Sequence, residues 1–469
     1  MMATLLYELL KRKWLFVALA VGALIALLPT PEGLTRQGQL VLAITVGSVF
    51  IYVTEPVPLP TVALLIAVLQ VLLGIAEPGE VAHSFMSDSV FFIMGSLMIA
   101  VAFVKQKLDR RIAYLLLRVT GGSPYRFALG VMLAAGLIAS VIGEHTVAAI
   151  LLPVCVVVIR AVYDREGEDK TLAAMILFSL AYGATIASIG TPSGAARNAI
   201  MIQYWRDLKD IAVSYTDWAV ACYPALLLLL PAAALILRFT FKPRVKSLSR
   251  VMVRLRSEVQ EAGGLASRDW MTIAIFLFIL ILWLTGSGIW GLGTVALIGA
   301  VLYLVTGLVD WSDLNSGVNW GVVLLYAAAM SIGVAMVRWG AAAWVAHAFL
   351  GGLRVVGLGQ GVALLLAVAV MVTLVTNTMS GGAAVAVLAP ITLEIAGLAQ
   401  MNPLAMGFLT AVASSFGFLS VASHPGITIV YSAGYLTAAD FLRQGWRVAL
   451  ASVIILVLYT STYLQWVCG

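Results

Sequence analysis

The stretch that decides the fold of this chain is 125-YRFALGVMLAAGLIASVIGEHTVAAILLPVCVVVI-159, an apolar run interrupted by Glu144 and His145. A charged side chain at the centre of a bilayer costs about 3 kcal/mol on insertion scales, so an ionisable residue at that depth is a functional candidate by default. The run is also too long for one membrane-spanning helix. Its polar centre predicts a helical hairpin whose turn lies at membrane depth, buried in protein or beside a wet cavity.

Composition assigns the whole chain to the membrane. The 469 residues are 62% hydrophobic and 11% charged, whereas a soluble domain is about 45–50% apolar and about 25% charged. We therefore expect an all-α polytopic membrane protein. The formal charge of +6 comes from a few basic loops, which are determinants of topology and do not point to a nucleic-acid partner. The three cysteines have no metal-binding spacing.

Apolar windows of about 20 residues are long enough to cross the hydrocarbon core. Eleven spans are expected, near residues 14–30, 38–54, 60–76, 89–104, 172–190, 217–240, 270–287, 291–307, 319–337, 402–422 and 445–464. Two further stretches, 125–160 and 361–396, have polar centres at Gly143–Thr146 and Thr376–Gly382. We expect both to be re-entrant helical hairpins. The first span follows Lys11, Arg12 and Lys13 and is expected to be an uncleaved helix, because no cleavage site follows it.

Basic residues predict the orientation. They cluster near residues 11–13, 105–118, 160–170, 242–256 and 443–447. All five clusters fall on one side only if the first hairpin is re-entrant. The positive-inside rule makes that side cytoplasmic. The protein is therefore expected in the cell (inner) membrane as a multi-pass protein, with its N-terminus in the cytoplasm and its C-terminus outside.

The two halves of the chain resemble one another. The segment 148-AAILLPV parallels 385-VAVLAPI, and each is followed by a helix broken at a proline, 186-IASIGTPSGAARN and 419-LSVASHPGITI. Upstream, 90-VFFIMGSLMIAVAFV parallels 322-VVLLYAAAMSIGVAMV. Inverted repeats whose broken helices meet at the midplane are typical of secondary transporters.

The expected organisation has four parts. They are an N-terminal segment 1–37 with the first transmembrane helix; a first inverted repeat 38–241, with scaffold helices 38–104, hairpin 125–160, broken helix 172–198 and helix 217–240; a basic cytoplasmic linker 242–268; and a second inverted repeat 269–469, with scaffold helices 270–337, hairpin 361–396, broken helix 402–430 and helix 445–464.

On these hairpins and breaks, and on the tail 427-ITIVYSAGYLTAADFLRQG, the chain resembles the divalent anion/sodium symporter family of the ion-transporter superfamily. The resemblance covers nearly the whole chain. It implies a homodimer that works by an elevator motion. It also implies Ser-Asn-Thr at each hairpin tip, where the tips and the facing loops bind sodium and a di- or tricarboxylate or sulfate.

The chain departs from that pattern at four places. The first break reads Gly190-Thr191-Pro192-Ser193-Gly194-Ala195-Ala196-Arg197-Asn198, with a few extra residues before the asparagine. Gly143-Glu144-His145 stands at the first tip, and Ser380-Gly381-Gly382 stands at the second, with Asn377 and Thr378 just upstream. The second break reads Ser423-His424-Pro425, where the family tends to have Gly-Thr-Pro.

Physical chemistry independently favours the tips and breaks as the site. Helix N-termini present unpaired N–H groups that attract anions, and the opposed carbonyl ends can coordinate a cation. Expected contacts to the substrate are Glu144, His145, Thr146, Thr191, Pro192, Arg197, Asn377, Thr378, Ser380, Gly381, Gly382, His424 and Pro425. Expected contacts to the coupling ion are Gly143, Glu144, Ser188, Gly190, Asn377, Ser380, Ala422 and Ser423, with Na⁺ at both hairpin tips and no other cofactor. The alternative is that the hairpins simply pack through small residues.

Several roles remain open for the charged residues. Glu144 can be a sodium ligand, a proton carrier or the counter-ion of Arg197 or His145. Arg197 can instead face the substrate, because its planar fork suits a carboxylate or sulfate. His145 and His424, one in each break, can donate to an anion or titrate near neutral pH, or they can be packing histidines.

Enzyme signatures are missing from the sequence. Glu144-His145 lacks the second histidine of a His-Glu-x-x-His zinc site, and no Gly-x-Ser-x-Gly elbow or phosphate loop is present. We expect a transporter of a small divalent or polyvalent anion, coupled to sodium. The alternatives are proton coupling, exchange, or a cation/proton antiporter of the same superfamily. A channel and a membrane-embedded hydrolase are distant alternatives.

Overall fold

The computed structural model describes residues 13–54, 56–106, 120, 122–166, 168–248, 266–318, 320–421 and 423–468, and every regular element within them is helical. Ala422 and part of the expected linker, residues 249–265, lie outside the described residues, and so does the side chain of His145.

The first half of the chain contains α2 (Lys13–Leu27), α3 (Arg36–Thr54), α4 (Leu59–Leu72), α5 (Pro78–Phe85), α6 (Asp88–Lys105), α8 (Pro124–Ile142), α9 (Glu144–Glu166), α10 (Lys170–Ala187), the 3₁₀ turn η1 (Pro192–Gly194), α11 (Ala196–Lys209) and α12 (Tyr215–Thr240). The second half contains α14 (Ser267–Trp290), α15 (Leu292–Val305), α16 (Trp311–Gly317), α17 (Trp320–Arg338), α18 (Ala341–Val355), α19 (Gly361–Thr376), α20 (Gly381–Leu398), α21 (Pro403–Ala413), α22 (Pro425–Ser432), α23 (Ala438–Tyr459), the π-helical turn η2 (Thr460–Leu464) and α24 (Gln465–Cys468).

The all-α class predicted from the sequence is confirmed, but the expected number of spans is not. By length and composition, seven described helices could cross a membrane, or up to eight if the bent pair α17–α18 is one span. Several expected spans, among them α2, α4 and α15, form shorter apolar helices. Since α8 has 19 residues and could itself cross, re-entry of the first hairpin stays a prediction.

Helices of one half pack on helices of the other in a reciprocal pattern. Helix α4 packs on α17 while α15 packs on α6, and α11 packs on α20 while α22 packs on α9. The two short helices follow the same rule, because α5 contacts α17 and α16 contacts α6.

Ion pairs strengthen those two short-helix contacts. Arg338, the last residue of α17, lies 2.8 Å from the Glu80 carboxylate of α5. Lys105, the last residue of α6, pairs with both Asp313 and Asp310 at the start of α16. In each case a cation at a helix C-terminus meets an acid at a helix N-terminus, which suits both helix dipoles.

The two hairpins turn in different ways. A single residue, Gly143, separates α8 from α9, and its φ of +100° favours glycine over any residue with a Cβ. Helices α19 and α20 are joined by Asn377–Ser380, and the Ser380 hydroxyl caps α20 by accepting a hydrogen bond from the Ala383 N–H at 3.3 Å.

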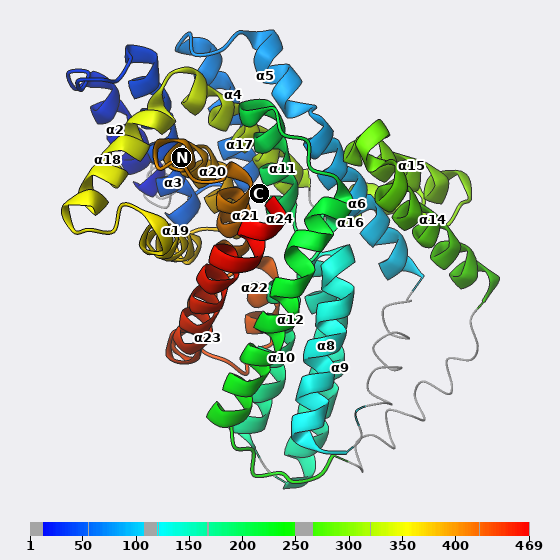
Figure 1. Ribbon diagram of the computed structural model, residues 1–469. Helices are drawn as coiled ribbons and strands as arrows, with labels where there is room; N and C mark the ends of the chain where they lie inside the picture. Colours follow the sequence, from blue (N-terminus) through cyan, green and yellow to red (C-terminus); the bar gives the residue numbers. More distant parts are fainter. Residues whose placement is uncertain are drawn as a thin grey trace, which may run out of the picture.

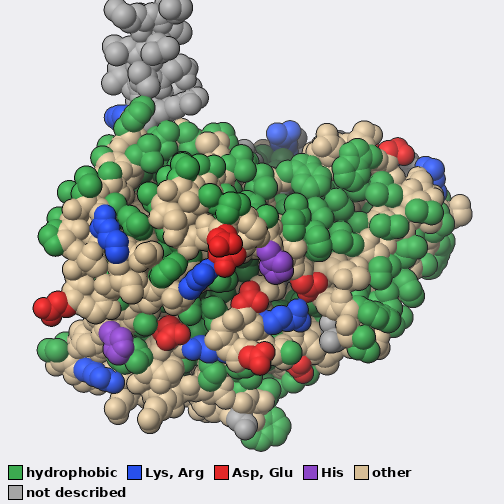
Figure 2. Space-filling view, turned by 90° about the horizontal axis from the view of Figure 1, so that it is seen from above, with side chains coloured by type: hydrophobic (Ala, Val, Ile, Leu, Met, Phe, Trp, Pro, Cys, Tyr) green, Lys and Arg blue, Asp and Glu red, His purple; other side chains and the backbone are tan. Residues whose placement is uncertain are grey.

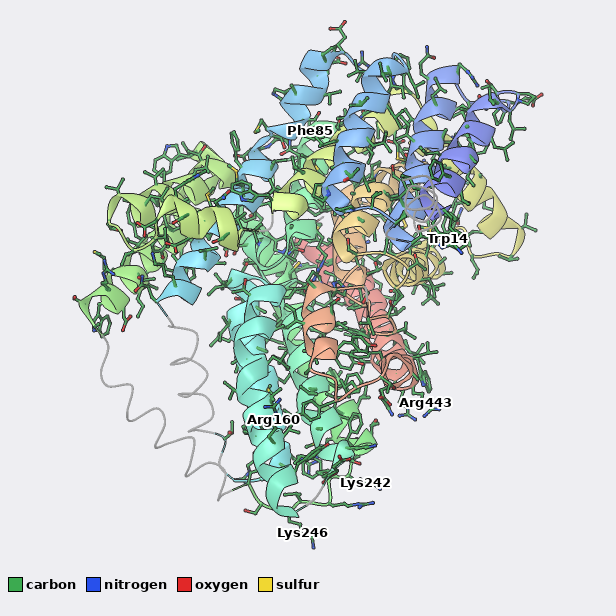
Figure 3. All side chains as sticks on the ribbon, turned by 180° about the vertical axis from the view of Figure 1, so that it is seen from behind. Trp14, Phe85, Arg160, Lys242, Lys246 and Arg443 are labelled. Carbon is green, nitrogen blue, oxygen red and sulfur yellow. The ribbon has the colours of Figure 1, made fainter. Side chains whose placement is uncertain are left out.

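Helices α8, α9, α10, α12, α22 and α23 form a bundle that extends beyond the rest of the molecule (Figure 1). Arg160, Lys242, Lys246 and Arg443 lie toward the free end of this bundle (Figure 3). Clustered basic residues are what the positive-inside rule expects on a cytoplasmic face, and the orientation itself stays a prediction.

Candidate transport site at the two helix breaks

The first break separates α10 from α11. Pro192, which has no N–H, opens the short turn η1, and Thr191 and Ala195 on either side have extended backbones. A Cβ on Gly194 would collide with the carbonyl oxygens of Ser188 and Ser140, so only glycine fits at this position. The broken segment is therefore pressed against the end of α8.

Side chains satisfy the carbonyls that this break exposes. The Asn198 amide donates to the carbonyl oxygens of Ser188 at 2.8 Å and Thr191 at 2.7 Å. The Thr191 hydroxyl donates to the Ser140 carbonyl near the first hairpin tip. The tip and the break of the first half are thus fixed to each other.

The second break separates α21 from α22 and is tied to the second tip by Asn377. The Asn377 amide donates to the Phe416 carbonyl at 3.1 Å and accepts from the Leu419 N–H at 2.8 Å. At the start of α20, the Gly381 N–H donates to the Ser423 carbonyl at 3.2 Å. Tip and break therefore form one unit in this half too.

The two breaks meet at Glu144, the first residue of α9. Its Oε1 atom lies 3.6 Å from Arg197 Nη1 of the first break and 3.2 Å from His424 Nδ1 of the second. The Ser188 hydroxyl donates to Oε2 at 3.3 Å. Glu144, Arg197 and His424 are only 6%, 2% and 1% exposed. We call Glu144, Ser188, Arg197 and His424 the charge cluster.

Electrostatics make the charge cluster interdependent. A carboxylate at the N-terminus of α9 is favoured by the helix dipole, but a guanidinium in the first turn of α11 faces the positive end of its helix. Arg197 therefore depends on Glu144, and Arg197 also donates to the Ser188 hydroxyl and to the Thr185 carbonyl. Removing one partner from such a buried pair leaves an uncompensated charge.

Four buried polar atoms at the breaks have no hydrogen-bond partner within the described part of the chain. They are Oγ1 of Thr185, Nε of Arg197, Oδ1 of Asn198 and Nε2 of His424. Nearly all buried polar atoms in proteins are hydrogen-bonded. These unpaired groups can therefore form hydrogen bonds with a polar ligand bound between the two breaks.

The structure brings most of the expected site residues to the two breaks. Gly190, Thr191 and Pro192 form the first break, and Asn377, Gly381 and Ser423 hold the second together. Thr378 is exposed, and its hydroxyl bonds the Val375 carbonyl of its own helix turn.

Sequence reasoning missed some residues of the site. It did not assign roles to Asn198 and Ser140, whose contacts cross between segments, or to Thr185. Nor did it pair His424 with Glu144. The only sequence signal was position, because Asn198 stands within the quoted first break and His424 within the second.

A separate cleft of about 490 Å³ lies between α5, α11 and α17. It is lined by polar side chains that include Glu80, His83, Gln203, Asp207 and Arg338. Figure 2, which shows the molecule from above, has acidic, basic and histidine side chains near the middle of a largely apolar surface. This cleft separates the short helix α5 from the C-terminal half of α11.

A helical membrane protein with two buried helix breaks joined by a charged cluster is organised as a secondary transporter. The chain belongs to the family described as the sodium:sulfate symporter transmembrane region, whose model matches residues 10–469. The resemblance found in the sequence is thereby confirmed. This family and the relatives below are transporters, so the prediction of a transporter and not an enzyme is also confirmed.

Relatives of known name agree with this family. The sodium-dependent dicarboxylate transporter SdcS of Staphylococcus saprophyticus is 23% identical over 471 residues, covering 94% of this chain and 90% of the relative. SdcS of Staphylococcus aureus is 22% identical over 482 residues, covering 97% and 92%.

Two solved structures share the fold. They are the YdaH transporter of Alcanivorax borkumensis (TM-score 0.57, 14% identity, covering 85% of this chain and 88% of that one) and MtrF of Neisseria gonorrhoeae, from a class of antimetabolite efflux pumps (TM-score 0.56, 11% identity, covering 97% and 94%). At these identities the likeness concerns the fold alone.

Proposed function

We propose that this protein is a secondary active transporter that moves a small divalent or polyvalent anion, a di- or tricarboxylate or sulfate, across the cytoplasmic membrane with sodium as the coupling ion. Family membership and the dicarboxylate-transporter relatives support the substrate class. The observation that carries the proposal is the charge cluster, in which Glu144, Arg197 and His424 join the breaks of both halves in one buried place.

The anion is recognised mainly by helix N-termini and His424. The guanidinium of Arg197 is directed at Glu144, Ser188 and Thr185, so it is not the main anion contact. Helix α20 begins with two glycines. The Gly381 N–H already donates to the Ser423 carbonyl, whereas the lack of a side chain at Gly382 allows a ligand to approach the helix N-terminus closely. The His424 ring abuts Gly381, where a Cβ would lie 2.7 Å from Cε1.

Sodium is proposed to bind where the second tip meets the second break. Carbonyl groups at the ends of broken helices are the usual ligands for coupling sodium in transporters. Ser380 and Ser423 lie at this junction, joined through the Gly381 N–H.

An elevator motion of a homodimer is proposed as the transport mechanism. Each tip is hydrogen-bonded to the break of its own half, and the charge cluster joins the two halves. A ligand held there would travel with both tips together. The moving body would be both hairpins with residues 172–240 and 402–464, and it includes the bundle that extends from the molecule in Figure 1.

A thermal-shift screen of purified protein tests the proposed function. Dicarboxylates, citrate, sulfate and phosphate are compared with and without sodium at several pH values. A bound anion at 100 times its Kd should stabilise the protein by about 2.7 kcal/mol, and sodium should increase that effect.

Stabilisation by cations alone would indicate a cation/proton antiporter. Anion stabilisation that depends on pH but not on sodium would indicate proton coupling, and dependence on neither would indicate exchange. Uptake into proteoliposomes would then measure transport.

A further inference from the structure

The two breaks differ in charge although they are matched in position. Aligning Pro153 with Pro390 places Glu144 opposite Gly381. Aligning Pro192 with Pro425 places Arg197 opposite Val430. The first half therefore carries a carboxylate at its tip and a guanidinium at its break, and neither has a counterpart in the second half.

The guanidinium of Arg197 lies at the C-terminal end of α10, the helix that precedes the first break. Arg197 donates to the Thr185 carbonyl in the last turn of α10 at 3.4 Å and to the hydroxyl of Ser188, the C-cap residue of that helix. The next residue, Asn198, donates to the carbonyls of Ser188 and Thr191. Oxygen atoms of this kind, at the C-terminal end of a broken helix, are those that coordinate a coupling cation in transporters.

We infer that the guanidinium of Arg197 is a built-in counter-cation that fills the first of two cation positions, so that coupling sodium binds only at the second break. The inference rests on the proposed sodium-coupled function and specifies its coupling site. It replaces the sequence-based expectation of Na⁺ at both tips with Na⁺ at the second tip alone.

Two physical reasons support it. Glu144 already lies 3.6 Å from a permanent positive charge, because an arginine does not lose its proton in a protein. A sodium ion placed on the same carboxylate would face that charge in a buried, low-dielectric site, where repulsion between like charges is strong. Asparagine, serine and backbone groups hold the second tip and break together, and His424 directs its Nδ1 at Glu144. The described residues of this break therefore place no guanidinium beside sodium.

The test compares sodium-dependent stabilisation in four proteins: the parent chain, Arg197→Gln, Glu144→Gln, and both changes together. Potassium replaces sodium at constant ionic strength in the reference samples. Arg197→Gln should gain sodium-dependent stabilisation beyond that of the parent, and the double variant should not have this gain. The Hill coefficient for sodium in uptake by Arg197→Gln should rise by about one if a second cation position is opened. Arg197→Lys, which keeps the charge, should not show the gain in sodium-dependent stabilisation.

Glu144→Gln keeps the experiment decisive if Arg197→Gln does not fold. In the parent background, the sodium-dependent stabilisation should persist after this change, because sodium does not use Glu144. Its loss would overturn the inference, as would the lack of any sodium gain in folded Arg197→Gln. Anion-dependent stabilisation is recorded in parallel. If the parent protein is not stabilised by any anion, the proposed function is refuted. If anions stabilise the parent but the sodium response is lost in Glu144→Gln, only the inference that Arg197 replaces a sodium ion is refuted.

Discussion

At the scale of single residues, Glu144 determines whether the two breaks can be buried at all. A carboxylate and a guanidinium, each under one-tenth exposed, are tolerated because they neutralise each other. His424 adds a contact from the other half of the chain. A substitution in the charge cluster is therefore expected to change both the stability of the protein and its ligand binding.

Removing either partner of this pair should destabilise the protein. Glu144→Gln leaves Arg197 buried and unpaired, which should cost about 3–5 kcal/mol. Adding Arg197→Gln should recover much of that loss, and unfolding measurements on both single variants and the double variant yield the coupling energy. Arg206→Gln is the matched control, because this arginine of the same helix is exposed and should lose about 1 kcal/mol or less. A coupling energy near zero would contradict the pairing.

Gly381 should not tolerate even a methyl group. A Cβ there would lie 2.7 Å from both the Ser414 carbonyl and His424 Cε1, so Gly381→Ala must displace the tip from the break. We expect anion uptake to fall at least about tenfold, a loss of about 1.4 kcal/mol in transition-state stabilisation. Gly397→Ala, near the other end of α20 with no neighbour within 4 Å of its Cβ, should transport normally. Equal activity of the two variants would show that the tip has room to spare.

At the scale of elements, small residues let helix backbones touch. Helices α8 and α10 pack at Gly183, where a Cβ would lie 2.6 Å from the Met132 carbonyl oxygen. Close approach of this kind drives helix association in lipid, where the hydrophobic effect contributes little.

Gly183→Ala should therefore loosen the α8–α10 contact. We expect a loss of about 1–3 kcal/mol from overpacking, measured as a lower unfolding temperature. The control is Gly351→Ala in α18, where no atom lies within 4 Å of the added Cβ; alanine there should be neutral or stabilising by up to about 1 kcal/mol. A stable Gly183→Ala protein would mean that the two helices can separate without penalty.

The short helix α16 should make stability depend on acid pH. A hydrogen bond from Lys105, followed by the backbone N–H of Asp310, lowers the pKa of Asp313 below its usual 3.8. A depressed pKa contributes stability above the unfolded value, and that contribution is lost as pH falls through the folded value. Asp313→Asn should therefore flatten the decline in unfolding temperature below about pH 4. The effect should be small because the pair is solvent-exposed, and an unchanged pH profile would argue against the ion pair.

At the scale of the whole molecule, the elevator proposal requires the site to move relative to α5 and α17. Ser84 of α5 and Asp207 of α11 line opposite sides of the 490 Å³ cleft. Linking cysteines at these two positions with a short bifunctional reagent should stop uptake. Linking Val220 of α12 to Tyr463 of η2, where the Tyr463 hydroxyl donates to the Val220 carbonyl at 3.2 Å, should leave uptake intact, because both belong to the proposed moving body. The opposite result would favour two halves that rock about the site.

Much of the fold could be predicted from local sequence pattern. Apolar run length indicated membrane helices, the polar centre at Gly143–Thr146 located the first turn, and Pro192 and Pro425 marked both breaks. These features are local, because a missing N–H, a glycine with positive φ or a run of leucine acts on its own segment. The number of full spans was not predicted correctly, although α4 and α15 end just before Gly74 and Gly307, whose positive φ terminates a helix locally.

The sequence by itself determined that the protein is helical, lies in the membrane, belongs to a transporter family and carries its charges at two helix breaks. Only the tertiary structure decided which charges meet. Glu144 and His424 are 280 positions apart, and no periodicity connects residues at that separation. Their contact exists because α22 packs on α9, and packing between distant helices depends on the shape of the whole folded chain.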